Sequence, residues 1–173
     1  MEIDKKRSRY KWILYIALLM VTAILQSTWL SHVRILGGTP QLMPFAVSVI
    51  AMLEGVSGGA SAGLAAGILM DALSSPSEGF YTVIYVVCGI VVSILNAFMY
   101  RKTYVVSLLF WVVAMLVTNV FYYLIFILTL GRAGPLALVR MIPGELVATL
   151  IFTPFIYLAL RGLHRRFRPE DEQ

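Results

Sequence analysis

The chain has 173 residues, of which 60% are hydrophobic and only 13% are charged. A soluble domain of this length carries roughly a quarter charged residues, so the composition excludes an ordinary water-soluble protein. The net charge of +5 does not indicate nucleic-acid binding, because the basic residues gather beside long apolar runs. That placement is typical of the orientation signals of membrane proteins.

The first apolar run, residues 12–30, is expected to be a membrane helix that follows a basic N-terminal segment, residues 1–11. It would extend roughly 28 Å, close to the hydrocarbon thickness of a bilayer. It is too long for the apolar core of a cleaved signal peptide, and no small-residue cleavage site closes it. We therefore expect this helix to be retained.

The next apolar stretch, residues 42–70, is too long for one span without strong tilt, since it would reach roughly 43 Å. Glu54-Gly55 stands in its middle, so we divide it there into a short second span, residues 42–53, and a third span, residues 55–70. The short span is expected to be tilted, shielded by its neighbours or incompletely spanning.

Three further spans are predicted, which gives one all-α, polytopic domain of about six transmembrane helices over residues 12–160. A loop over residues 71–79 precedes the fourth span, and residues 161–173 form a basic and acidic tail. The last three spans cover residues 81–100, 104–130 and 138–160.

The distribution of basic residues supports an even number of spans. With six spans, the N-terminal segment, the Arg101-Lys102 turn and the C-terminal tail share one side and hold 11 of the 14 Lys and Arg residues. Arg34, Arg132 and Arg140 fall on the other side. The positive-inside rule then places both termini in the cytoplasm.

Residues 59–63 match G-x-S-x-G, a pattern of serine hydrolases, but the match is weak. The pattern requires a strand–turn–helix context and a nearby base. The two histidines, His32 and His164, are predicted on opposite sides of the membrane. We therefore expect no enzyme activity from Ser61. No metal-binding or nucleotide-binding motif is present, no cofactor is expected, and the single Cys88 is interpreted as a small buried hydrophobe.

A row of glycines is the clearest packing signal in the sequence. Gly55, Gly59, Gly63 and Gly67 recur every fourth residue and therefore share one helix face. Such a groove lets another helix backbone approach closely. The partner helix is either internal, with the short second span as the favoured candidate, or part of another protein.

Ionisable residues near the predicted outer side suggest a polar layer. Its members are Gln26, Asp71, Arg140 and Glu145, in which Asp71 or Glu145 could pair with Arg140. Ionisable groups are expensive in lipid, so each is a candidate site. A structural ion pair or helix cap is the plainer interpretation, and a proton relay or ligand site is the sharper one.

Five segments, taken in order, form a recognisable set. They are residues 25–28 (Leu-Gln-Ser-Thr), residues 37–42 (Gly-Gly-Thr-Pro-Gln-Leu), the glycine row ending in Asp71, residues 78–80 with Tyr85, and residues 154–158 before a basic tail. Together they resemble the rod shape-determining protein MreD family. The resemblance covers nearly the whole chain and implies a fold similar to the substrate-binding subunits of energy-coupling-factor transporters.

The resemblance implies a non-enzymatic scaffold of the bacterial cell-elongation machinery, which supports rod shape and lateral peptidoglycan synthesis. The implied partner is MreC, a single-pass protein, with the actin-like MreB, the glycosyltransferase RodA and a class B penicillin-binding protein. The alternative is a small-molecule-binding transporter subunit, which would need a pocket near the outer face lined by Asp71, Glu145 and aromatic residues such as Trp29 and Tyr81.

Overall fold

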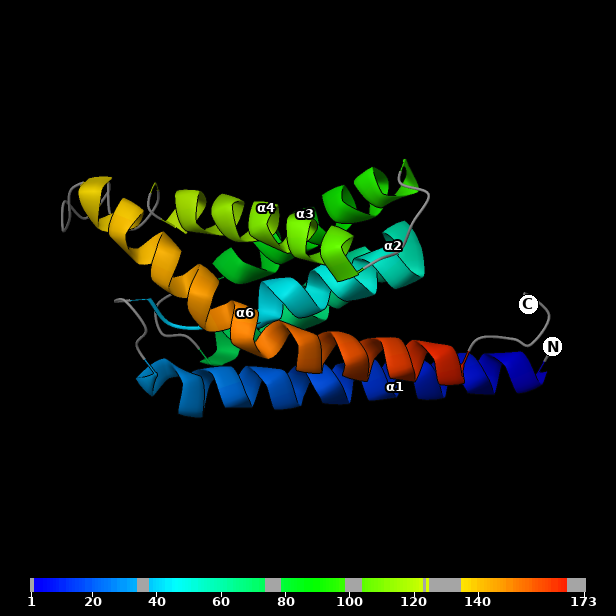
Figure 1. The fold of residues 1–173 in the computed structure, drawn as a ribbon. Coiled ribbons are helices and arrows are strands. Elements are labelled where there is room, and N and C mark those ends of the chain that lie inside the picture. Colours follow the sequence, from blue (N-terminus) through cyan, green and yellow to red (C-terminus); the bar gives the residue numbers. More distant parts are fainter. Residues whose placement is uncertain are drawn as a thin grey trace.

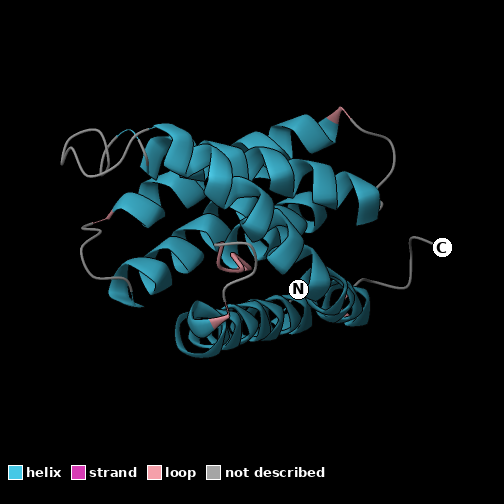
Figure 2. Cartoon of the chain, turned by 60° about the vertical axis from the view of Figure 1, so that its left-hand side comes forward, coloured by secondary structure: helices cyan, strands magenta, loops and turns pink. Residues whose placement is uncertain are grey.

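A computed structural model of the chain describes residues 2–33, 38–73, 79–98, 104–122, 124 and 135–167, with the side chains of 2–8, 122 and 135–141 left out. Every described element is a helix (Figure 2). Their bounds are α1 Glu2–Ile24, the π turn η1 Leu25–Trp29, the 3-10 turn η2 Leu30–His32, α2 Met43–Leu73, α3 Phe80–Ala97, α4 Tyr104–Tyr122 and α6 Pro135–Arg166.

Five of these helices are long and apolar enough to cross a membrane, which confirms an all-α, multi-pass membrane protein. The terminal helices extend beyond the predicted spans. Helix α1 begins at Glu2, inside the predicted basic segment, and α6 continues to Arg166. Helix α4 ends at Tyr122, and residues 125–134 of the predicted fifth span and the loop after it lie outside the described residues.

Helix α2 is broken where the sequence predicts, at Gly55. This glycine has φ 76° and ψ −166°, a conformation that is essentially restricted to glycine. A Cβ added at Gly59 would lie 2.9 Å from the Cβ of Ala51, whereas a continuous helix would separate these positions by roughly 12 Å along its axis. The chain therefore folds back at Gly55 into two arms, residues 43–54 and 56–73 (Figure 1).

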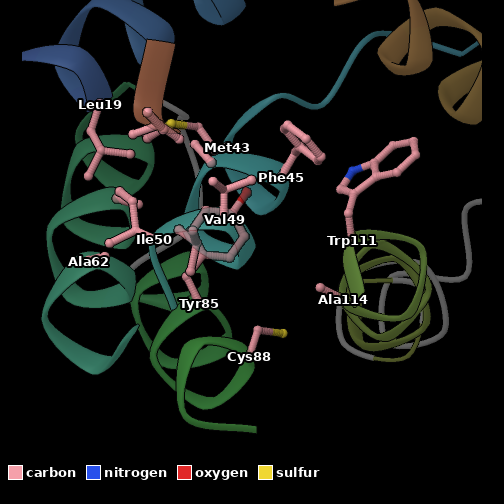
Figure 3. Close-up of a cluster of buried hydrophobic side chains, with 14 of the residues drawn as sticks. Leu19, Met43, Phe45, Val49, Ile50, Ala62, Tyr85, Cys88, Trp111 and Ala114 are labelled. Atoms are coloured by element: carbon pink, nitrogen blue, oxygen red, sulfur yellow. The ribbon is translucent and has the colours of Figure 1, made fainter. Parts of the chain in front are cut away.

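The short first arm is the centre of the bundle. Every residue from 42 to 52 is buried, and α1, α3, α4 and α6 all contact α2. Of the three alternatives for the short span, the structure shows that its neighbours shield it. In Figure 3, Phe45 lies toward Trp111 of α4, with the ring centroids 6.1 Å apart, while Ile50 faces the second arm and α3. An arm this short tolerates the membrane because protein, not lipid, surrounds it.

Polar side chains of α3 stabilise the broken end of the first arm. A helix end leaves carbonyl groups without intrahelical partners. Ser93 Oγ lies 3.1 Å from the carbonyl oxygen of Ala51 and 3.0 Å from that of Gly55, and its one proton is shared with the carbonyl oxygen of Gly89 in its own helix (2.8 Å). Asn96 Nδ2 donates to the carbonyl oxygen of Met52 over 3.1 Å. Helix α3 thus places polar donors at the broken end of the arm.

The glycine row packs inside the molecule, mainly against α3. Added Cβ atoms at Gly63 and Gly67 would overlap backbone atoms of Tyr85 and Thr82, respectively. Gly59 faces Gly89, a glycine whose importance the sequence analysis missed. The favoured partner, the short second span, meets the row where Ala51 faces Gly59.

Gly55 was wrongly placed in this row. A Cβ added there would meet nothing within 4 Å, so Gly55 is required for its backbone conformation at the turn and leaves helix packing to the other three. Gly55 shares the four-residue spacing of the other glycines. A spacing pattern alone does not show where a helix reverses, so it could not separate Gly55 from the row.

The close crossing of α2 and α3 gives the first prediction. Gly63→Leu is expected to lower the apparent melting temperature in detergent, because the side chain must separate two backbones. Gly162→Leu is the matched control, since a Cβ at Gly162 meets nothing within 4 Å. Equal melting temperatures for both variants would contradict the packing role of Gly63.

Candidate functional site

Gln26, the first residue of the predicted polar layer, caps helix α2. It lies in the π turn at the end of α1, and its Oε1 accepts hydrogen bonds from the backbone N–H groups of Leu42 (2.8 Å) and Met43 (3.0 Å). The first N–H groups of a helix have no intrahelical acceptors. One side-chain amide therefore joins the end of the first span to the start of the buried arm.

Asp71 caps helix α3 from the end of α2. Its carboxylate accepts hydrogen bonds from the backbone N–H groups of Tyr81 (3.0 Å) and Thr82 (2.9 Å), and from the hydroxyl of Thr82 (2.6 Å). A negative charge at a helix N-terminus is stabilised by the helix dipole as well as by the hydrogen bonds. The plainer interpretation, a helix cap, describes these contacts.

Glu145 is the most deeply buried carboxylate of the layer, with 4% of its surface exposed. Its Oε2 accepts a hydrogen bond from Asn119 Nδ2 of α4 over 2.6 Å, and it also forms a side-chain hydrogen bond with Gln41. The backbone N–H of Gln41 donates to Thr149 Oγ1, one turn along α6 (2.9 Å). Glu145 thus joins α4 and α6 to the segment that leads into α2.

The predicted polar layer is therefore a set of interhelical links at one end of the bundle. Gln26 and Glu145 meet the same short segment, residues 41–43, whereas Asp71 holds α3. The predicted pairing of Asp71 or Glu145 with Arg140 lies outside the described residues, because the Arg140 side chain is among those left out. Among the described residues, Asp71 is bonded to N–H and O–H groups of α3, and Glu145 is bonded to an N–H group of Asn119.

A second polar cluster, which the sequence analysis missed, surrounds Glu54 beside the turn of α2. Its carboxylate accepts hydrogen bonds from Lys11 Nζ (2.6 Å), the Tyr15 hydroxyl (2.7 Å) and His164 Nδ1 (2.8 Å). The side chains of Lys11, Glu54 and His164 are only 13–19% exposed. Glu54 thus attaches both terminal helices to the α2 turn.

One signal for this cluster was present in the sequence. Glu54 is the single charged residue between residues 42 and 70, and a carboxylate within an apolar stretch requires partners. The pattern indicated the helix break beside it but could not name Lys11 and His164, which are 43 and 110 residues away. The cluster lies roughly 22 Å along α1 from Gln26, at the opposite end of the bundle.

Ser61 has only local contacts among the described residues. Its hydroxyl donates to the carbonyl oxygens of Ser57 (2.7 Å) and Gly58 (3.1 Å) of its own helix. His32 bonds to the carbonyl oxygen of Thr28, and His164 bonds to Glu54. The arrangement thus places neither histidine in hydrogen-bond contact with Ser61.

The described residues line two hollows near the end that carries Gln26. A groove of about 290 Å³ between α1 and α6 is lined almost entirely by apolar side chains, including Trp29, Phe152 and Phe155. A cleft of about 300 Å³ has a wall that is half polar and includes Gln26, Gln41 and Tyr81. The pocket expected for a transporter subunit is thus not found as one site. Trp29 lines the groove, Tyr81 lines the cleft, and Asp71 and Glu145 line neither.

Comparisons of this chain with protein-family models, curated proteins and solved structures found no match. The resemblance to the MreD family stays a prediction from the segments quoted for it.

The Glu54 cluster gives the second prediction. Glu54→Gln is expected to lower the free energy of unfolding by about 2–3 kcal/mol, because charge-assisted hydrogen bonds are lost from a largely buried site. Thermal unfolding in detergent would measure the loss. Lys11→Met, alone and combined with Glu54→Gln, completes a double-mutant cycle. Losses that simply add would show that Lys11 and Glu54 do not interact.

The cap on α3 gives the third prediction. Asp71→Ala should destabilise the protein by about 1–2 kcal/mol, since it leaves the first N–H groups of α3 without an acceptor. Asp71→Asn keeps one acceptor oxygen and should lose less. Melting temperatures of the two variants in one detergent would rank them, and an Asp71→Ala protein as stable as wild type would rule out the cap.

Proposed function

We propose that the chain is a non-enzymatic membrane scaffold of the bacterial cell-elongation machinery, which supports rod shape and lateral peptidoglycan synthesis together with an MreC-like single-pass protein. MreB, RodA and a class B penicillin-binding protein are the further partners of this proposal. The protein lies in the cytoplasmic membrane, with both termini in the cytoplasm.

The observation that carries the proposal is that the segments resembling MreD contain the residues on which this bundle depends. Gln26 caps the buried arm, Gly63 and Gly67 bring α3 against α2, and Asp71 caps α3. Residues that hold a bundle together are those that proteins with the same fold are expected to share. The role in cell elongation rests on the family resemblance.

The outer surface supports a role in assembly. Large apolar side chains are exposed on α1, α3, α4 and α6, as Val83, Val105, Phe155 and Leu158 illustrate with 65–70% exposure. The glycine groove is already filled by α3, so a partner span would dock on the outer faces of these helices or on the exposed face of the second arm of α2, which carries Leu64 and Ile68. A protein with mostly membrane-embedded helices interacts chiefly through such surfaces.

The positions of the basic residues support the proposed orientation. The start of α1 and the end of α6 lie at the same end of the bundle, which Figure 1 shows and the Lys11–Glu54–His164 contacts require. The basic N-terminal segment and Arg161 and Arg165 therefore gather at one side. The positive-inside rule assigns that side to the cytoplasm.

A small-molecule-binding transporter subunit is the second candidate, and the half-polar cleft favours it. About 300 Å³ reaches the lower end of the range for ligand pockets. The cleft lies away from the basic end and therefore opens toward the outside of the cell in the proposed orientation.

Affinity purification from the native membrane tests the two candidates. The tagged chain should co-elute with an MreC-like protein in near-stoichiometric amount and with cell-wall synthases, identified by mass spectrometry. Ser61→Ala should give the same result, because Ser61 has no proposed catalytic role. Elution with an ATPase module would favour the transporter subunit, and elution without any elongation protein would contradict the scaffold.

A further inference from the structure

The half-polar cleft lies where four segments of the chain meet. The turns after α1, the segment before α2, the end of α2 and the start of α3 each contribute to its wall. Its polar groups are amides and hydroxyls, and no Lys or Arg is among its described lining residues. They belong to Gln26, Ser31, Thr39, Gln41, Tyr81 and Tyr85, among others.

Contacts outside the cleft hold its two amides in place. Gln26 accepts backbone hydrogen bonds through Oε1, so its NH₂ group is the end that is left to donate. The backbone N–H of Gln41 donates to Thr149 Oγ1, which fixes this residue at the wall, and a side-chain amide can both donate and accept. The wall therefore presents a fixed donor from Gln26 beside the amide of Gln41.

Tyr85 adds a hydroxyl group that has no hydrogen-bond partner among the described residues. Its side chain is 1% exposed, and it lines the cleft. Figure 3 shows the residue reaching from α3 toward Val49 and Ile50 of the first arm, so the core holds the ring in place. The hydroxyl oxygen itself is not fully enclosed by the protein, so a ligand or water in the cleft can form a hydrogen bond with it.

Charge selects the type of ligand. Asp71 accepts a hydrogen bond from the backbone N–H of Tyr81, a residue of the wall, so a carboxylate lies beside the cleft. With this carboxylate close by and no cation in the described lining, an anionic ligand would be disfavoured. The ring of Tyr81, 5.7 Å from that of Tyr85, adds an apolar surface of the kind on which a sugar ring can rest.

We propose that this cleft binds a neutral, hydroxyl-rich solute about the size of one sugar ring, which Gln26, Gln41 and the Tyr85 hydroxyl recognise by hydrogen bonds. The volume of about 300 Å³ accommodates one such ring. The site rests on the cleft alone and is independent of the proposed scaffold role.

Direct binding to the full chain tests the site, with N-acetylglucosamine and glucose as the probes. The protein is placed in phosphatidylcholine nanodiscs, because maltoside detergents would themselves supply sugar rings. Saturation-transfer NMR and calorimetry should show both sugars binding with a Kd of about 1–10 mM. Glucose 6-phosphate should bind at least about tenfold more weakly, since it carries negative charge.

Tyr85→Phe is the decisive variant, because it removes one hydroxyl and keeps the ring in the core. It should weaken sugar binding roughly fivefold, the effect of one neutral hydrogen bond, without lowering the melting temperature. Tyr157→Phe is the matched control: Tyr157 is 4% exposed and lies in α6 beside Tyr104, away from the cleft. Its sugar binding should equal that of wild type.

Three results would overturn the proposal: no binding of either sugar at tens of millimolar, equal binding by wild type and Tyr85→Phe, or glucose 6-phosphate binding as well as glucose. Affinity purification of Tyr85→Phe distinguishes this site from the scaffold. An unchanged yield of the MreC-like partner, together with weakened sugar binding, would show that the cleft acts independently of assembly.

Discussion

The structure depends on a broken helix whose backbone groups must all find partners away from lipid. In hydrocarbon there is no water to replace a lost hydrogen bond, so a reversal such as the one at Gly55 is tolerated only inside protein. Ser93 and Asn96 supply donors to the broken end, and the neighbouring helices surround the short arm. The close glycine contact between α2 and α3 keeps Ser93 within hydrogen-bond distance of that end.

The two polar clusters perform related tasks at opposite ends of this buried arm. At one end, Gln26 and Glu145 hold the segment that begins α2. At the other, Glu54 draws α1 and α6 onto the turn. Because carboxylates in a membrane protein are costly unless they are partnered, these contacts define a single arrangement of the helices more strongly than apolar packing could alone.

This architecture is suited to a protein that acts through its surface. Its interior is closed by packed side chains around the first arm, while the faces of α1, α3, α4 and α6 remain apolar and exposed. The cleft beside Gln26 is compatible with that role, because its wall is built from residues already held by the helix caps.

The sequence by itself determined the membrane class, the all-α fold and the break at Gly55, because these follow from local composition and from the conformations that glycine allows. It also pointed to a close helix contact along Gly59, Gly63 and Gly67, since fourfold spacing places residues on one helix face. Only the tertiary structure decided that the main partner is α3, that Gly55 belongs to the turn, and that Glu54 meets Lys11 and His164. Those contacts join residues far apart in the chain, and their distances depend on how the helices are arranged, which a periodic pattern does not contain.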